Sequence, residues 1–288
     1  MKSTTPFFKF SFLVLLTPLF FLGCGGNLQS MAQGYLYAAA TANKTAVPAQ
    51  PPEGYGQDYL QVSSGSSAMK IHLWYWTETQ NPQAPVILHL HGNAENIGSL
   101  YTSHFLAKME TLGAHFVVVD YPGYGKSTGP LTQESVLASA NAALLWTHKK
   151  FPQSPVIVWG WSLGSAVTAQ VVLQNQTIIK AFVMDSAWTS VRKLAKEIFG
   201  GLASQLSESW YQKNEWDSYA AAPQIHIPGL MHHGSKDNLI PWSFGKDLSE
   251  QFPKGLVTFT TIAGKGHGDI FAVPEYWTEL KSFIDQNR

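Results

Sequence analysis

The sequence predicts an α/β fold, in which a mostly parallel twisted sheet carries helices on both faces and a short cap. Continuous apolar runs rich in β-branched residues, such as 156–159, alternate along the chain with segments of helical pattern. That order is typical of parallel strands and their crossover helices, and continuous runs indicate strands buried on both faces. Hydrophobic residues make up 45% of the 288 residues and charged ones 13%, which favours one large core.

Residues 1–23 have the layout of a secretory signal peptide. Lys2 and Lys9 precede an apolar run over 10–22, and no acidic residue lies among them. As a helix that run would span about 20 Å, which is short of the roughly 30 Å hydrocarbon core, and Pro18 interrupts it. A lasting transmembrane anchor is therefore disfavoured.

Leu22-Gly23-Cys24 resembles the lipobox of bacterial lipoproteins, in which the cysteine is acylated before cleavage. Phe21 departs from the leucine usual in that motif. The resemblance implies an exported lipoprotein anchored to a membrane of the bacterial cell envelope through Cys24. The alternatives are a cleaved signal that releases a soluble secreted or periplasmic protein, or an uncleaved one, with an incidental cysteine. Cys24 is the only cysteine, so an intrachain disulfide is excluded.

Residues 24–54 join the signal peptide to the domain predicted over 55–288. The segment has no acidic residue before Glu53 and is rich in Gly, Ala, Gln, Thr and Pro, which is typical of a tether. Tyr35-Leu36-Tyr37 offers a second interpretation, in which the segment packs on the domain. The sequence leaves both open.

The domain begins with a predicted antiparallel hairpin of strands over 59–62 and 69–76, joined by a polar turn over 63–67. Further strands are predicted over 85–91, 115–120, 156–159, 181–185, 227–233 and 257–262. Helices are predicted over 98–111, over 132–148 with Thr132 as the N-cap, and from 165 onward.

The strand over 156–159 runs directly into Gly160-Trp161-Ser162-Leu163-Gly164, and a helix with small and apolar residues follows. A serine between a strand and a helix in a Gly-x-Ser-x-Gly pattern is typical of a nucleophile elbow. Glycines suit this turn because strand and helix pass close together and leave no room for a Cβ. The alternative is a flexible loop that contains the pattern by chance.

Five motifs in this order resemble the α/β-hydrolase superfamily: His91-Gly-Asn-Ala, Asp120-Tyr-Pro-Gly-Tyr-Gly-Lys-Ser-Thr-Gly, Gly160-Trp-Ser-Leu-Gly, Gly234-Ser-Lys-Asp and Gly266-His-Gly-Asp. The resemblance covers about 55–288 and is closest to single-domain serine hydrolases related to prolyl-oligopeptidase-type peptidases and protein depalmitoylases. Pro122 and Gly268 depart from the residues frequent in those motifs. Both affect loop detail only.

The resemblance implies a catalytic triad of Ser162, Asp237 and His267, in the chain order nucleophile, acid, base. His267 lies in a glycine-rich loop after the last predicted strand, and Asp237 follows the strand that ends near His233. Asp185 is the second candidate for the acid, because it also closes a strand. Asp269 is interpreted as structural, since it is too near His267 in sequence to orient it.

The backbone N–H groups of Leu163 and Asn93 are the expected oxyanion hole, one after the nucleophile and one in the His-Gly-Asn-Ala turn. His89 and His91, two apart on one predicted strand, are expected to share a face, but no acidic ligand precedes Glu95 there. We therefore expect no metal site and no cofactor. Asp120 is expected to hold the turn over 121–129 through backbone N–H groups.

The predicted activity is hydrolysis of an ester or thioester, in a small-molecule or acylated substrate, through an acyl-enzyme. A serine peptidase is the alternative within enzymes, and a non-catalytic envelope scaffold is the rival of another class. Aromatic residues in the predicted cap over 186–223 either line an acyl pocket or pack on the sheet. Nineteen basic residues balance nineteen acidic ones without a Lys/Arg cluster, so nucleic acid is not an expected partner. The sequence predicts no oligomeric state.

Overall fold

The computed structural model describes residues 28–288, so the predicted signal peptide over 1–23 and Cys24 lie outside the described residues. An eight-stranded sheet has the order β1-β2-β4-β3-β5-β6-β7-β8. β1 and β2 form the antiparallel hairpin, β2 pairs antiparallel with β4, and the other neighbours are parallel. The strands are β1 (Tyr55–Ser64), β2 (Ser67–Trp76), β3 (Val86–Leu90), β4 (His115–Val119), β5 (Val156–Trp161), β6 (Ile179–Asp185), β7 (Gly229–Gly234) and β8 (Val257–Ile262).

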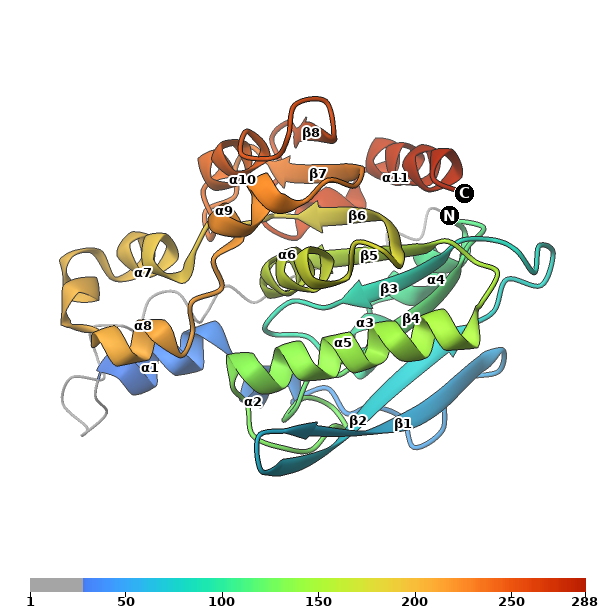
Figure 1. Cartoon of the computed structure of the whole chain (residues 1–288), viewed down its shortest axis with the longest axis horizontal. Coiled ribbons are helices and arrows are strands. Elements are labelled where there is room, and N and C mark those ends of the chain that lie inside the picture. The colour runs from blue at the N-terminus through green and yellow to red at the C-terminus, as the bar shows by residue number, and fades with distance from the viewer. Residues whose placement is uncertain (1–27) are drawn as a thin grey trace, which may run out of the picture.

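Helices cover both faces of the sheet, as Figure 1 shows. One face carries α5 (Gln133–Lys150), α6 (Leu163–Asn175) and α10 (Trp242–Ser249); the other carries α3 (Ile97–Thr102), α4 (Phe105–Glu110) and α11 (Pro274–Gln286). The buried apolar residues form two clusters, one on each side of the sheet. β3 alternates between them, with Val86 and Leu88 in the first and Ile87 in the second, which explains why apolar residues point to both faces of this strand.

Three local predictions meet different outcomes. The N-cap at Thr132 is confirmed, because its side chain accepts a hydrogen bond from Ser135 N in a reciprocal capping box. The single helix over 98–111 is wrong: the chain breaks at His104, whose φ of 61° is left-handed, and α3 and α4 are separate. The hairpin strands extend further than predicted, because Ser64 pairs with Ser67 across a tighter turn.

The segment before the sheet packs on the domain. Within it, α1 (Leu28–Leu36) and α2 (Ala39–Ala42) lie at the end of the sheet toward which the parallel strands point (Figure 1). Leu36, Tyr37 and Ala42 are buried in the first cluster. Of the two interpretations left open by the sequence, residues 28–54 therefore follow the packed one.

The predicted cap lies between β6 and β7. It consists of α7 (Val191–Phe199), the 3₁₀ turn η2 (Gly200–Gln205), α8 (Glu208–Gln212), α9 (Ser218–Ala221) and the 3₁₀ turn η3 (Ala222–Gln224). A further 3₁₀ turn, η4 (Asp269–Ala272), precedes α11. Figure 1 shows α8 beside α1, and Trp210 Nε1 donates to Gln33 Oε1 across the two at 3.1 Å. Within residues 28–288, no helix combines the length and apolarity needed to cross a membrane.

Candidate active site

Ser162 lies between β5 and α6 in a strained backbone conformation. Its φ of 56° and ψ of −115° are rarely adopted by residues other than glycine. A Cβ on Gly160 would lie 2.0 Å from Gly164 O, and a Cβ on Gly164 would lie 1.8 Å from Leu90 O. Glycine is therefore required at both positions for strand and helix to pass this closely, and the turn presents the serine at the strand's end.

Three predicted site residues meet at this turn, although they are distant in the sequence. Ser162 Oγ lies 3.0 Å from His267 Nε2. His267 Nδ1 lies 2.7 Å from Asp237 Oδ2. The loop after β8 carries His267 and the loop after β7 carries Asp237, so the parallel sheet delivers both to the edge where β5 ends.

Asp237 is held as a carboxylate by its surroundings. Burial alone would raise its pKa, but the neighbouring His267, hydrogen bonds from His233 and His267, and the Ile240 N–H together hold the pKa well below its usual range. The N–H groups of Leu239 and Ile240 each donate to Oδ1 at 2.9 Å. Oδ2 therefore stays ionised and can accept the Nδ1 proton of His267. The Nε2 lone pair is then free to accept the Ser162 proton.

The other two aspartates have different partners. Asp185 is fully buried and accepts hydrogen bonds from Trp159 Nε1 at 2.6 Å and Tyr276 OH at 2.7 Å, with His232 Nδ1 at 2.9 Å. These contacts tie β6 to β5, β7 and α11. Asp269 accepts from Gly266 N at 3.2 Å and so braces the loop that carries His267.

Sequence reasoning missed two residues that hold His267 in place. Trp161 Nε1 donates to the carbonyl oxygen of His267 at 3.2 Å, and its ring lies 5.1 Å from the imidazole. Ser186 Oγ donates to the same carbonyl at 3.0 Å. The only sequence signal for Trp161 was its place as the residue before the serine in the Gly-x-Ser-x-Gly pattern. Ser186 belongs to no motif that could have indicated its role.

The two predicted oxyanion donors lie in turns that follow neighbouring strands. Leu163 is the first residue of α6, so its N–H has no acceptor within that helix. Asn93 lies in the turn after β3, the strand that pairs with β5. Its carbonyl accepts from Tyr124 OH at 3.0 Å, and its side chain donates to Tyr35 O at 2.7 Å.

Glu95 is a further residue of this region, to which the sequence analysis assigned no role. It is buried in the turn over 92–96, and its Oε2 accepts the Gly92 N–H at 3.0 Å. Burial raises its pKa to about 7, against the smaller opposing effect of the Gly92 N–H. The detectable signal was an acidic residue in a turn that is otherwise uncharged.

His89 and His91 were expected to share a face of the strand, but their rings pack against different core clusters. His89 is buried against Phe105 and Trp159, and burial lowers its pKa to about 3, so it is neutral. His91 lies beyond the end of β3 and packs on Tyr121 and Tyr124. Among residues 28–288, no group of three potential ligands gathers in a way that could hold a metal ion.

Asp120 braces the turn over 121–129 as predicted, and it does more. Its Oδ2 accepts the Lys126 N–H of that turn at 3.3 Å. Its Oδ1 accepts the Ile97 N–H at 2.8 Å, and His72 Nδ1 lies 3.2 Å from Oδ2. The carboxyl therefore also links the turn to α3.

Comparison with known proteins identifies the fold. Residues 85–208 match the model of a family described as alpha/beta hydrolase fold. The lysophosphatidylserine lipase ABHD12 of Danio rerio is 27% identical over 265 residues, covering 78% of this chain and 68% of that protein. The human protein ABHD12B is 28% identical over 189 residues, covering 62% of this chain and 52% of that protein. The chain thus spans between about half and two thirds of these relatives.

Solved structures resemble most of this chain. The esterase Pf2001 of Pyrococcus furiosus superposes with a TM-score of 0.66 at 16% identity, covering 84% of this chain and 96% of that one. Est1E of Butyrivibrio proteoclasticus, solved with ferulic acid bound, gives a TM-score of 0.60 at 16% identity, covering 79% and 96%. These comparisons agree with the observed topology: the chain has the α/β-hydrolase fold.

Proposed function

We propose that the chain is a serine hydrolase that cleaves a carboxylic ester or thioester. The observation that supports this most is the continuous line of hydrogen-bonding atoms from Ser162 Oγ through His267 to Asp237 at a strained strand-to-helix turn. A neutral serine hydroxyl is a weak nucleophile, and an adjacent oriented base is what activates it.

In the proposed mechanism, Ser162 Oγ attacks the substrate carbonyl carbon while His267 Nε2 takes the hydroxyl proton. The C=O electron pair moves onto oxygen, and the N–H groups of Leu163 and Asn93 stabilise the resulting oxyanion. The intermediate collapses as Nε2 returns the proton to the leaving alcohol or thiol, which leaves an acyl-enzyme. Water, deprotonated by the same nitrogen, then releases the acid and restores Ser162.

The substrate class is proposed from the cap and the relatives. Phe199 and Trp210 belong to cap segments that adjoin α1 at the catalytic edge, which suits an apolar acyl group near Ser162. The relatives named lysophosphatidylserine lipase support an acylated substrate. We propose that the protein belongs to the single-domain branch that the His-Gly-Asn-Ala motif indicates, and that its preferred substrate is a single-chain acyl ester.

We further propose that Cys24 is acylated and anchors the exported protein in a bacterial envelope membrane. The support is the lipobox-like Leu22-Gly23-Cys24 after an apolar signal. Balanced charge without a basic cluster continues to argue against nucleic acid as a partner.

Turnover of matched substrates tests the proposed activity. The purified protein is assayed with p-nitrophenyl esters of increasing acyl length, a thioester, a lysophospholipid and amino-acid p-nitroanilides. We expect ester or thioester hydrolysis that disappears in Ser162→Ala and persists in Ser282→Ala, a surface serine of α11. Preferential cleavage of the anilides would identify a peptidase instead. Turnover of none of them would favour a non-catalytic scaffold.

A further inference from the structure

The segment over 28–49, here called the N-terminal strap, is joined to the active site by directed hydrogen bonds. One of them reaches the turn over 92–96, here called the oxyanion turn because it carries the proposed donor Asn93. Asn93 Nδ2 donates to the carbonyl oxygen of Tyr35 at 2.7 Å, across 58 residues of sequence. From the other side, Tyr124 OH donates to Asn93 O at 3.0 Å. Asn93 is thus held between the strap and the turn over 121–129.

The strap also holds the residues that follow Asn93. Asn96, the N-cap of α3, donates from Nδ2 to Ala42 O at 2.9 Å and to Thr45 O at 2.8 Å. A Cβ on Gly98 would lie 2.5 Å from Ala46 O, so strap and helix are in direct backbone contact. The oxyanion turn and the start of α3 therefore rest on the strap as one unit.

The turn that carries Tyr124 rests on the same strap. Asn43 Nδ2 donates to Gly123 O at 2.8 Å, and Asn43 Oδ1 accepts the Gly125 N–H at 2.7 Å. Lys126 Nζ donates to Ala49 O at 2.9 Å. Both groups that hold Asn93, the Tyr35 carbonyl and the Tyr124 hydroxyl, therefore depend on the position of the strap.

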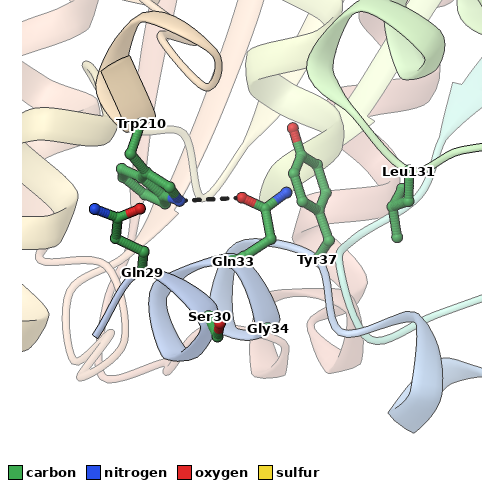
Figure 2. Close-up of a pocket in the computed structure, with 7 residues that line it drawn as sticks. All are labelled: Gln29, Ser30, Gln33, Gly34, Tyr37, Leu131 and Trp210. Carbon is green, nitrogen blue, oxygen red and sulfur yellow. Dashed lines mark hydrogen bonds between the residues drawn. The ribbon is translucent and has the colours of Figure 1, made fainter. Parts of the chain in front are cut away.

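The cap closes the other side of the strap. Trp216 Nε1 donates to Tyr37 OH at 2.8 Å, and the Tyr35 ring lies edge-on to Phe199 at 6.1 Å. Gln33, Tyr37 and Trp210 are among the residues that line a cavity of about 440 Å³. Figure 2 shows these side chains and the hydrogen bond that joins Trp210 to Gln33. The strap is thus fixed between the cap and the turns at the catalytic edge.

We propose that the N-terminal strap positions the oxyanion turn, and that the Asn93 side chain is the positioning residue through which it acts. This inference rests on the proposed function, because it assigns a role to the Asn93 N–H. An oxyanion donor works only within about 2.7 to 3.1 Å of the transition-state oxygen. A turn released from the strap loses that alignment while substrate binding continues. The effect should therefore fall on kcat and leave KM unchanged.

Asn93→Ala tests the contact, because it removes the amide that bonds Tyr35 O and keeps the backbone N–H. We expect kcat for an ester to fall at least about tenfold, with KM within about twofold of the original value. Affinity for a trifluoromethyl ketone, which forms a tetrahedral adduct with Ser162, should fall in parallel with kcat/KM. Asn175→Ala is the matched control, since its side-chain bonds to Val171 O and Asn141 lie within and beside α6, at the end away from the elbow.

Gly98→Ala tests the strap from a second position, by pushing it off α3 without touching Asn93. We expect the same pattern: a lower kcat, a weaker ketone inhibitor and an unchanged KM. Gly201→Ala is the control, because nothing lies within 4 Å of a Cβ there. A change in the thermal midpoint alone, with kcat retained, would assign both contacts a structural role.

The two failures are distinguishable. If the unmodified protein turns over esters but Asn93→Ala and Gly98→Ala keep kcat and ketone affinity within twofold, the strap proposal is overturned and the hydrolase stands. If the unmodified protein neither turns over esters nor binds the ketone, the proposed function itself fails. If Asn93→Ala does not fold, the kcat and ketone affinity of Gly98→Ala decide whether the strap proposal holds.

Discussion

At Asp237, burial and hydrogen bonding act on the carboxyl in opposite directions. Burial disfavours the charge, but His267, His233 and the Ile240 N–H favour it more strongly, so the pKa lies well below its usual range. Asp185 is buried as deeply, yet its partners are Trp159, Tyr276 and His232. The environment, more than the residue type, separates the proposed catalytic acid from a carboxyl that joins strands and helices.

Replacing each aspartate by asparagine should therefore give different results. Asp237→Asn should lower kcat for esters by about 10³ to 10⁴, because the amide cannot stabilise the imidazolium, while the thermal midpoint changes little. Asp185→Asn should lower the thermal midpoint by several degrees, since three buried donors share this carboxyl and an amide nitrogen cannot accept their hydrogen bonds. Steady-state kinetics and calorimetry on both variants check this. Retained activity in Asp237→Asn would remove Asp237 from the triad.

Glu95 makes a prediction about pH. Burial raises its folded pKa from an ordinary value of 4.5 to about 7, so between these pH values the folded state holds a proton that the unfolded state has released. Its contribution to the free energy of unfolding is therefore present at low pH and is lost as pH rises from about 4.5 to 7. Between pH 5 and 8, the free energy of unfolding of the unmodified protein should fall by up to about 3 kcal/mol relative to that of Glu95→Gln. Urea denaturation of the two proteins across this pH range measures the difference. The same change in the free energy of unfolding with pH in both proteins would contradict the prediction.

At the scale of single residues, motifs predicted the side chains of the proposed triad but not the hydrogen bonds that side chains make to distant backbone groups. Ser162, Asp237 and His267 carry recognisable side chains in recognisable loops, so their meeting was predicted before the structure. The bond from Asn93 to Tyr35 O was not, because any residue supplies a carbonyl oxygen and no sequence pattern marks it. Glu95 differs from both, since an acid in an uncharged turn was visible but had no assigned role.

Among the elements, the elbow is the most constrained by space. A Cβ on Gly164 would overlap the carbonyl of Leu90, which is backbone of β3 and cannot move aside. Gly164→Ala should therefore lower the free energy of unfolding by about 3 kcal/mol or prevent folding, as overpacking at fixed backbone does. Denaturant unfolding of purified protein checks this. An alanine accepted within about 0.5 kcal/mol would show that α6 and β3 are less closely packed than described.

In α1, by contrast, replacing a glycine by alanine should raise the free energy of unfolding. Gly34 lies inside this helix with nothing within 4 Å of a Cβ, so Gly34→Ala should stabilise the protein by about 0.5 to 1 kcal/mol. A segment that behaved as a free tether would show no change, because no helix would form to be stabilised. The same denaturant titration measures it.

Helices and strands were predicted well where the spacing of apolar residues reflects which side chains are buried, and less well elsewhere. All eight strands follow from apolar runs or alternation. The helix over 98–111 failed because nothing in the sequence around His104 signals a left-handed residue. The segment over 24–54 has the composition of a tether, yet Leu28, Ala32 and Leu36 recur at helical spacing and pack on the domain. That spacing was the signal its polar composition obscured.

Over the whole molecule, the parallel sheet explains why distant residues meet. β5, β7 and β8 point the same way, so the loops after them share one edge, and the strap and cap pack over that edge (Figure 1). α1 begins at Leu28, four residues after Cys24. A lipid on Cys24 would therefore tie the membrane to the catalytic side of the domain, within about 14 Å of the start of α1.

The proposed anchor is tested by fractionation. Cys24→Ser should move the protein from the membrane fraction to the soluble fraction, because no thiol remains to be acylated and a single apolar signal is cleaved or weakly held. Metabolic labelling with an alkyne fatty acid should mark the unmodified protein only. Membrane association that persists unlabelled in Cys24→Ser would favour an uncleaved signal segment.

The account depends most on Ser162 being an activated nucleophile. A fluorophosphonate reacts with such a serine and leaves a stable adduct, which peptide mass spectrometry locates. We predict a single adduct, on the peptide that contains Ser162, lost in Ser162→Ala and much slower to form in His267→Ala. No labelling of the folded protein, or an adduct on another residue, would contradict it.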